Sequence, residues 1–515
     1  MKKNYIYTLI ILIGLLVSGF IVRSINLTYL PVFADEAIYV RWSQVMGHEP
    51  TLRFLPLSDG KQPFFMWILM FAVSRFSDPL FAGRFLSVMT GTGTILGVFS
   101  ISYLLFKSKK AAIFSALITS ICPFLVFFDR MALVDSMLTF WGTWAIFFSI
   151  ITAKTKRIDA ALFTGFCLGF AWLTKSPAIF LILLSPLSFI ISFDRKNIYK
   201  FGFQFFVLNL ISSIIAFAMY NILRLGPNFN LINSRNLDYV YPISHLFSSP
   251  LDPFVSQIDR SFEWIRIWGP APVLILAIFS LVVFLKQKRN ISENVFLFIL
   301  FITPIVMESA IAKVFTARYI LFTIPYLIIL AGNSILINLR YFKYIFYISV
   351  LVLLISSFVT IFNFWTDLER AAIPRSERSG YLEEWTAGNG IKQISEYIKD
   401  LHVKNPDKQI VVGTEGYFGT LPDGLQMYLD QLNSVIVVGI GLNIHEVPKP
   451  LAESRDAGNL TFLVINDSRF TYTGDPSELG LNLIASYKKA TRPPFVREYV
   501  QHGSNEHLLF FEVLK

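Results

Sequence analysis

The sequence predicts a polytopic α-helical membrane protein, with about eleven transmembrane helices and additional interfacial helices, followed by a C-terminal soluble α/β domain. Hydrophobic residues make up 54% of the 515 residues and charged residues only 16%, which is too apolar for a soluble chain of this size. Apolar runs recur at lengths close to the ~20 residues that cross a bilayer as a helix. From about Trp365 onward the apolar density falls, and short apolar runs typical of buried strands replace the long ones.

The membrane spans are expected where the long apolar runs lie. These runs are near 5–26, 85–106, 111–128, 136–152, 158–174, 177–193, 202–222, 268–285, 293–311, 319–338 and 343–363. No small-x-small cleavage site follows the first run, so we expect a retained helix rather than a signal peptide. The apolar segment 62–76 is expected to lie in the interface or to re-enter it. If this segment were a full span, the basic loop 107–110 would lie on the opposite side of the membrane from the other basic loops.

The basic residues predict the orientation of the chain. Sixteen Lys and Arg, against three acids, lie in Lys2, Lys3 and the loops 107–110, 154–159, 194–200, 286–293 and 340–343. Short loops rich in Lys and Arg stay in the cytoplasm, so the N-terminus is expected there and the C-terminal domain outside. The expected location is the plasma membrane of a prokaryote. The other charges of the membrane half then fall on the outer side, where ionisable groups near the hydrocarbon are usually functional.

The C-terminal residues predict a separate domain, so the expected domains are 1–364 and 365–515. Residues 391–401 form an amphipathic pattern, and short strands are expected at 410–412, 435–438, 462–465 and 508–511. About 150 residues are enough for an independent core. The glycine-rich stretch 413–424 is interpreted as a turn rather than a binding loop.

Composition excludes several classes of function. The net charge of +10 arises from clusters between apolar runs, so no nucleic acid partner is expected. Cys122 and Cys167 lie in apolar stretches and predict neither a disulfide nor a metal site. The six histidines lack ligand spacing, and no glycine-rich phosphate loop or nucleophile elbow is present. The chemistry is therefore expected to come from carboxylates and cations.

An acidic pair follows the first span, in Ala34-Asp35-Glu36-Ala37. A partly desolvated carboxylate at the membrane surface can act as a general base or bind a metal. The alternative is that Asp35 caps a helix beginning at Ala37. Glu36 is interpreted as a first-turn helix acid or a partner of Asp35.

A lysine precedes the interfacial segment, in Asp59-Gly-Lys61-Gln-Pro63. An ammonium near a helix start can bind a lipid phosphate, because backbone N–H groups add to its charge. The alternative is an anchoring lysine that extends to the headgroups, with Trp67 as an interfacial aromatic residue.

Two further polar turns interrupt apolar helices on the outer side. The first holds Asp129, Arg130 and Asp135, and the second holds Lys175 between Thr174 and Ser176. Two acids and an arginine at the end of a hairpin indicate either a second carboxylate site or a structural ion pair. Lys175 is equally ambiguous by itself.

The last polar group is Lys313, Arg318 and Tyr319, with Glu308 upstream. Arginine can bind a phosphate bidentately, which lysine cannot do. The alternative is an interfacial Arg-Tyr anchor. Glu308 is either a counter-ion or a further site carboxylate.

The order of these motifs resembles that of the membrane glycosyltransferases of the type C fold. The motifs are, in sequence, the acidic pair, the Lys-x-Pro, the Arg-x4-Asp hairpin, the Leu-Thr-Lys turn and the late Arg-Tyr. The resemblance covers about residues 1–340 and is to the group with protein O-mannosyltransferases and the lipid A aminoarabinose transferase. It implies an inverting transfer of a sugar from a polyprenyl-phosphate donor at the extracytoplasmic membrane face. The acceptor would be a hydroxyl or amine of a lipid, glycan or protein, and the sugar stays open.

The resemblance also implies roles for individual residues. Asp35 matches the catalytic aspartate, Lys61 the lysine of the Lys-Pro motif despite Gln62, and Asp135 the second acidic position. Arg318 matches the late arginine, so Lys61 and Arg318 would bind the donor phosphate. The other site-lining residues would be Glu36, Asp129, Arg130, Lys175, Glu308 and Lys313. No cofactor is certain, although Asp35 and Asp135 could share a divalent cation.

Departures from the resemblance leave other functions to weigh. The oligosaccharyltransferase Trp-Trp-Asp motif is absent, since the chain has only Glu384-Trp385-Thr386, and loop 223–267 is too short for a large lumenal domain. A transporter or flippase would need polar groups near the midplane on broken helices, and neither is apparent. The third alternative is a non-catalytic membrane glycan-binding protein.

Overall fold

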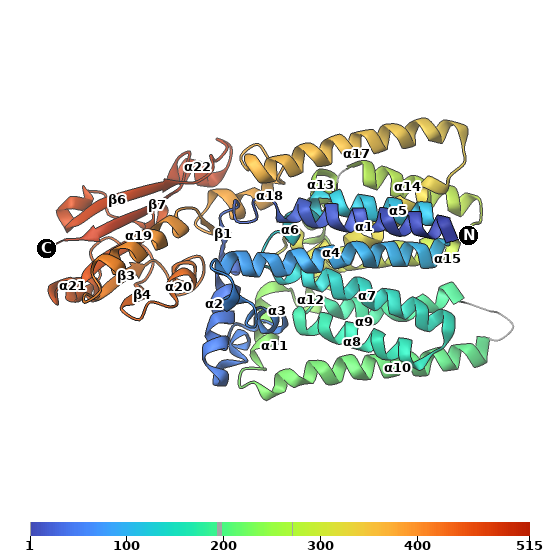
Figure 1. Ribbon diagram of the computed structural model, residues 1–515, viewed down its shortest axis with the longest axis horizontal. Helices are drawn as coiled ribbons and strands as arrows, with labels where there is room; N and C mark the ends of the chain where they lie inside the picture. The colour runs from blue at the N-terminus through green and yellow to red at the C-terminus, as the bar shows by residue number, and fades with distance from the viewer. Residues whose placement is uncertain (1, 193–197, 270, 515) are drawn as a thin grey trace. The chain divides into compact units, whose positions relative to one another are not determined.

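The computed structural model of the chain describes residues 2–192, 198–269 and 271–514 (Figure 1). The chain divides into two compact units. The helical unit comprises 1–27, 51–68 and 84–374, and the mixed unit comprises 28–50, 69–83 and 375–515. The unit boundary therefore lies at 374/375, ten residues beyond the expected 364/365, and two N-terminal segments pack with the C-terminal residues.

The helical unit has the predicted polytopic membrane architecture. Within the described residues, seven helical segments are long and apolar enough to cross a membrane, or nine if two bent pairs each count as one span. Six of these segments contain the long helices α1 (Lys2–Ser24), α4 (Pro79–Phe106), α7 (Val134–Thr155), α10 (Ile198–Tyr220), α15 (Ile291–Ile311) and α17 (Arg340–Thr366). In the seventh, Ala317–Leu336, 3-10 turns flank the shorter helix α16 (Ile324–Asn333). The bent pairs are α5 (Lys109–Ile121) with α6 (Pro123–Asp129), and α13 (Phe254–Trp268) with α14 (Ala271–Lys286).

Shorter apolar helices complete the predicted set of spans. They are α8 (Ile158–Thr174) and α9 (Ala178–Leu184), which continues into a 3-10 turn. A further short apolar helix, α3 (Phe64–Leu69), lies in the segment 62–76 that is expected at the interface. Each of the eleven predicted runs coincides with helix, except that residues 193–197 and 270 lie outside the described ranges. α4 begins six residues before the predicted start at 85, because Asp78 accepts hydrogen bonds from the backbone of Leu80 and Phe81.

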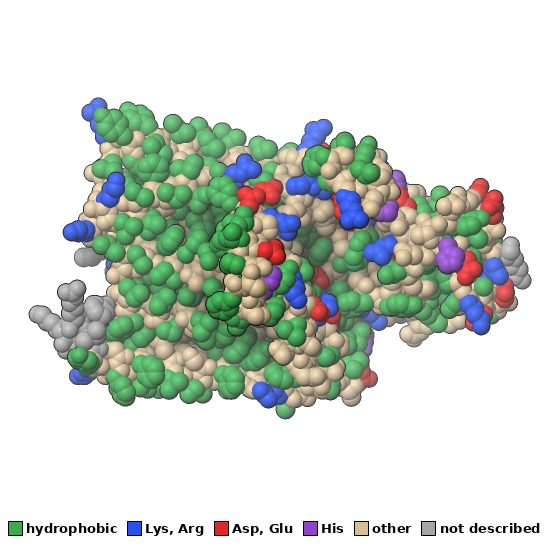
Figure 2. Space-filling view, turned by 180° about the vertical axis from the view of Figure 1, so that it is seen from behind, with side chains coloured by type: hydrophobic (Ala, Val, Ile, Leu, Met, Phe, Trp, Pro, Cys, Tyr) green, Lys and Arg blue, Asp and Glu red, His purple; other side chains and the backbone are tan. Residues whose placement is uncertain are grey.

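The burial of the helices matches a lipid-facing bundle. Every residue of α16 is buried, and this helix packs against α5, α14 and α15. By contrast, α1, α10 and α17 expose most of their large apolar side chains. Figure 2 shows apolar side chains over one face of the helical unit. Exposed apolar helices surrounding a buried one are what a bilayer requires, since lipid replaces water as the outer solvent.

Residues 223–267, the expected outer loop between two spans, contain helices. They contain α11 (Leu231–Tyr239), α12 (Ile243–Ser248) and most of α13. In α13, Trp264, Ile265 and Trp268 are buried, while polar residues occupy the opposite face.

The mixed unit is built on a five-stranded sheet with the order β4-β3-β5-β7-β6. The strands are β3 (Ile410–Thr414), β4 (Val435–Gly439), β5 (Leu460–Asn466), β6 (Leu481–Lys488) and β7 (His507–Val513). β3 runs parallel to β4 and β5, whereas β7 is antiparallel to β5 and β6. The four predicted strands and the predicted helix, α19 (Ile391–Lys404), are confirmed. β6 was not predicted because it is an edge strand that mixes polar and apolar residues.

A short strand explains why residues 28–50 belong to the mixed unit. β1 (Val32–Phe33) pairs antiparallel with β2 (Ala387–Gly388), and the Ala34 N–H donates to the Thr386 carbonyl at 3.2 Å. The helix that follows, α2 (Ala34–His48), packs against α20 (Asp423–Leu429). The segment that carries Asp35 is thereby joined to the C-terminal residues.

Candidate active site

The acidic pair lies in the first turn of α2. The N-cap of this helix is Phe33, so Asp35 is not the capping residue that the alternative interpretation required. Glu36 instead accepts a hydrogen bond from the Phe33 N–H at 3.0 Å, and its side chain is fully buried. Asp35 is half-buried one position earlier, where the positive end of the helix dipole favours an ionised carboxylate. The two acids therefore differ: Glu36 stabilises the helix start, and Asp35 does not cap it.

A close charge pair of the helical unit joins Asp135 and Lys175. Asp135 lies in the first turn of α7 and Lys175 directly follows α8. The Lys175 Nζ is 2.5 Å from Asp135 Oδ1 and 4.2 Å from the centroid of the Tyr319 ring. Burial lowers the pKa of Lys175, which lies in the connection after the helix. Asp135 Oδ2 is buried and has no hydrogen-bond partner among the described residues.

Arg318 and Glu308 lie near this pair. The Arg318 guanidinium is 5.8 Å from the Tyr319 ring, and both Arg318 and Glu308 interact electrostatically with Lys175. Glu308 is buried in the last turn of α15, and its Oε2 has no hydrogen-bond partner within the described ranges. We call Asp135, Lys175, Glu308 and Arg318 around Tyr319 the Tyr319 cluster. It brings together two carboxylates and two cations that are far apart in the sequence.

Lys61 lies in a turn that is tied to the Lys175 turn. Gly60 has φ +65°, and a Cβ there would lie 2.5 Å from the Cβ of Arg235, so the turn requires glycine. Lys61 Nζ is 3.3 Å from Asp59 Oδ2. The neighbouring Gln62 donates through Nε2 to Ser176 Oγ at 2.6 Å. The Lys-Gln-Pro turn and the Lys-Ser-Pro turn therefore lie side by side.

Asp129 and Arg130 belong to a different arrangement at the end of α1. Asp129 Oδ2 is 2.8 Å from Arg23 Nε, and Oδ1 accepts a hydrogen bond from Ser136 Oγ at 2.6 Å. Arg130 donates to the carbonyls of Arg23, Ile25 and Asn26. We call Arg23, Asp129 and Arg130 the Arg23 cluster. Its members hold the chain just before the segment that carries Asp35.

Lys313 is also outside the Tyr319 cluster. Its Nζ donates to the Leu237 carbonyl at 2.6 Å and lies 5.5 Å from the Tyr241 ring. These contacts hold Lys313 against the α11–α12 segment. The structure thus groups Asp135, Lys175, Glu308 and Arg318, with Lys61 in the adjoining turn, and separates Lys313, Asp129 and Arg130 from them.

Sequence reasoning missed Arg23 and Arg84, which are both fully buried. Arg84 donates to the Leu27 carbonyl at 2.9 Å. A weak signal was available, since Arg23 ends a long apolar helix with no acid nearby in the sequence. Such a charge needs a distant partner, because a buried unpaired cation is very costly.

Within the described ranges, no three His, Cys, Asp or Glu side chains converge as metal ligands. Asp135 is held by Lys175. A divalent cation shared with Asp35 therefore stays a prediction.

Comparisons with known proteins find similarity to membrane glycosyltransferases. The family model described as dolichyl-phosphate-mannose-protein mannosyltransferase matches residues 60–220, which include Lys61, Asp135 and Lys175. No curated protein gives a significant match to the sequence. The crystal structure of ArnT from Cupriavidus metallidurans bound to undecaprenyl phosphate is 14% identical, covers 98% of each chain and has a TM-score of 0.56. The apo structure of the same ArnT is 15% identical over 98% of each chain, with a TM-score of 0.58.

The two ArnT structures match both the membrane helices and the C-terminal residues, since nearly the whole of each chain is covered. At a sequence identity of 14–15%, this similarity shows the fold alone. The chain therefore has the fold of the two ArnT structures, which is the type C glycosyltransferase fold.

Proposed function

We propose that the protein is an inverting glycosyltransferase that moves a sugar from a polyprenyl-phosphate donor to an acceptor hydroxyl or amine at the extracytoplasmic face of the membrane. The Tyr319 cluster is the observation that carries the proposal. Its carboxylates keep two buried oxygens, Asp135 Oδ2 and Glu308 Oε2, without hydrogen-bond partners among the described residues. Such carboxylate oxygens can accept hydrogen bonds from a bound ligand.

The cations of this region suit a departing lipid phosphate. In the proposed reaction, the acceptor oxygen attacks the anomeric carbon as the bond to the phosphate oxygen breaks, and the phosphate leaves with the bonding pair. Lys61 and Arg318 stabilise the negative charge that develops there. Asp35 accepts the proton of the acceptor hydroxyl, and its place at a helix N-terminus favours the ionised form that a base requires. A single displacement of this kind inverts the anomeric centre.

Two comparisons support the donor class. The related ArnT structure is bound to undecaprenyl phosphate, and the matching family model is described by a dolichyl-phosphate sugar. The positive charge of the short loops supports an N-terminus in the cytoplasm and a C-terminal domain outside. Figure 2 shows basic side chains at one end of the helical unit, as this orientation requires.

The test is sugar transfer by purified protein in detergent from polyprenyl-phosphate mannose, glucose and aminoarabinose, with and without chelator. Asp35→Asn and Lys61→Ala should each reduce turnover by at least about 10²-fold. Asp159→Asn, on a half-exposed side chain, and Lys286→Ala, on an exposed one, are matched controls and should turn over normally. Wild-type rates for both site variants, or no turnover of any donor by the wild type, would overturn the proposal.

A further inference from the structure

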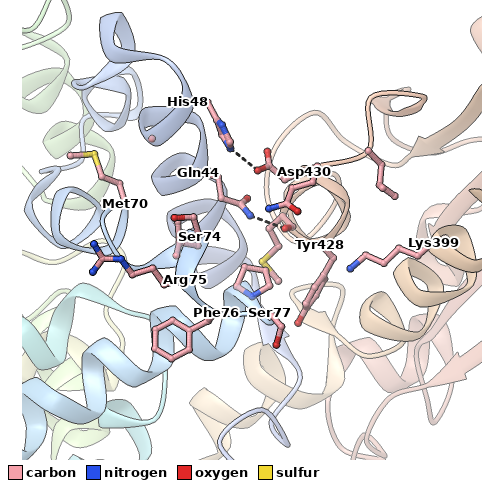
Figure 3. Close-up of a pocket in the computed structure, with 16 residues that line it drawn as sticks. Gln44, His48, Met70, Ser74, Arg75, Phe76, Ser77, Lys399, Tyr428 and Asp430 are labelled. Atoms are coloured by element: carbon pink, nitrogen blue, oxygen red, sulfur yellow. Dashed lines mark hydrogen bonds and ion pairs between the residues drawn. The ribbon is translucent and has the colours of Figure 1, made fainter. Parts of the chain in front are cut away.

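A cavity of about 580 Å³ lies within the mixed unit (Figure 3). Its walls come from the C-terminal half of α2, the segment 70–79, α19, and α20 with the residues that follow it. The volume falls within the range of ~300–1,000 Å³ that is typical of small-molecule sites. None of the residues assigned above to the sugar transfer lines this cavity.

One wall presents a hydrogen-bond acceptor that the protein does not satisfy. Gln44 is only 8% exposed, and its Nε2 donates to the Met427 carbonyl at 2.8 Å, as Figure 3 shows. Its Oε1 is buried and has no hydrogen-bond partner among the described residues. An amide oxygen accepts but does not donate, so its missing partner is a donor such as a hydroxyl group.

The charged residues of the cavity leave an excess of positive charge. Both oxygens of Asp430 are engaged, one by Arg41 and the other by His48 Nε2 at 2.9 Å. Lys399 and Arg75 have no ion-pair partner within the part of the chain that is described. Figure 3 shows the Lys399 ammonium extending toward Tyr428, whereas the Arg75 guanidinium points away from Lys399 on the segment 70–79. A ligand that complements these walls carries a negative charge.

The position of the cavity along α2 limits what it can hold. Asp35 lies at the start of this helix and Gln44 nine residues later. At 1.5 Å per residue, the two positions are about 14 Å apart along the helix axis. A group bound beside Gln44 is therefore not the hydroxyl that Asp35 would deprotonate.

We propose that this cavity binds an anionic sugar, one that carries a phosphate or a carboxylate, as a distal part of the acceptor. A sugar hydroxyl donates to Gln44 Oε1, and Lys399 binds the anionic group. The assignment to the acceptor rests on the proposed glycosyltransferase function, whereas the binding itself does not. The proposal makes the acceptor a large anionic glycoconjugate rather than a single neutral sugar.

Isothermal titration calorimetry of the purified full chain, without donor, tests the binding. The ligands are glucose 1-phosphate, glucuronic acid, neutral glucose and inorganic phosphate. Either charged sugar should bind at least tenfold more tightly than glucose and inorganic phosphate, and the one that binds better identifies the anion. Equal affinity for glucose overturns the role of charge, equal affinity for phosphate overturns the role of the hydroxyl, and no binding overturns the site.

Variants locate the binding within the protein. Lys399→Ala should weaken binding of the charged sugar by about tenfold or more, while Lys404→Ala, an exposed lysine on the same helix α19, should not change it. Gln44→Met should reduce the affinity for the charged sugar to that for inorganic phosphate. Thermal unfolding verifies that each variant is folded, and unchanged affinity in folded Lys399→Ala and Gln44→Met protein would overturn the proposal.

The two proposals fail separately. Asp35→Asn should keep the sugar binding and lose the turnover. Binding without turnover of any donor would contradict the glycosyltransferase, and turnover without binding would contradict the anionic sugar site.

Discussion

Two buried groups of charges in the helical unit differ in how completely their polar atoms are hydrogen-bonded. In the Arg23 cluster, Arg23 contacts Asp129 and three backbone carbonyls, and both Asp129 oxygens have partners. In the Tyr319 cluster, one oxygen of Asp135 and one of Glu308 have no hydrogen-bond partner among the described residues. The saturated group holds the end of α1, whereas the unsaturated group keeps binding capacity for something else. Hydrogen-bond saturation, more than charge or burial, separates a structural cluster from a candidate site.

The largest expected effect is on stability and comes from the Arg23 cluster. Asp129→Leu leaves the Arg23 guanidinium buried without its counter-ion, so we expect a loss of about 3–5 kcal/mol in the free energy of unfolding. The double variant Arg23→Met/Asp129→Leu should recover much of that loss because no charge is left uncompensated. Thermal unfolding in detergent measures both. A stable single variant would contradict the structural role of the pair.

The Tyr319 cluster should respond in the opposite way, with a loss of activity rather than stability. Asp135→Asn keeps the shape of the side chain and can still accept a hydrogen bond from Lys175. We expect kcat for sugar transfer to fall by about 10²-fold, while the unfolding temperature changes little. Loss of the fold with normal specific activity in the remaining protein would place Asp135 with the structural residues.

Glu308→Gln sharpens the comparison further. The substitution replaces a buried carboxylate that lacks a partner for one oxygen with a neutral amide of the same size. Removing an incompletely compensated charge should leave the unfolding temperature unchanged or raise it. Turnover should nevertheless fall by about tenfold. Full activity in the variant would show that the Glu308 carboxylate takes no part in sugar transfer.

The smallest expected effect extends the comparison to the mixed unit. Lys489 is buried and donates to the Glu384 carbonyl and to Asn466, so it resembles the saturated Arg23 cluster. Burial lowers the pKa of Lys489 from 10.5 to about 8. Below pH 8 both states of the protein bind this proton, and between about pH 8 and 10.5 only the unfolded state binds it. Stability should therefore rise with pH in that window, by about 1 kcal/mol between pH 8 and 9.

Unfolding of the wild type and of Lys489→Met at pH 7, 8 and 9 measures this contribution. The variant should lack the increment that the wild type shows between pH 8 and 9. An identical pH dependence in both proteins would show that Lys489 keeps its proton in the folded state.

Sequence order alone predicts some residues of the candidate site, and their roles stay predictions. Asp35, Lys61, Asp135 and Arg318 each follow or begin an apolar run, so the spacing of the runs indicated them. The same spacing equally indicated Asp129, which the structure pairs with Arg23, 106 residues away. No local pattern distinguishes these two aspartates, because their partners lie in other helices. Glu36 was separated from Asp35 only by its hydrogen bond to the Phe33 N–H.

By itself, the sequence determined the membrane architecture and the strands of the sheet core. Both depend on the length and period of apolar runs, which are properties of neighbouring residues. Only the tertiary structure decided that residues 28–50 pack with the C-terminal residues, that 223–267 is helical, and which buried carboxylates keep an oxygen without a partner. These outcomes depend on contacts between residues that are tens to hundreds of positions apart. The free energy of such contacts is set by burial and geometry, which no local stretch of sequence contains.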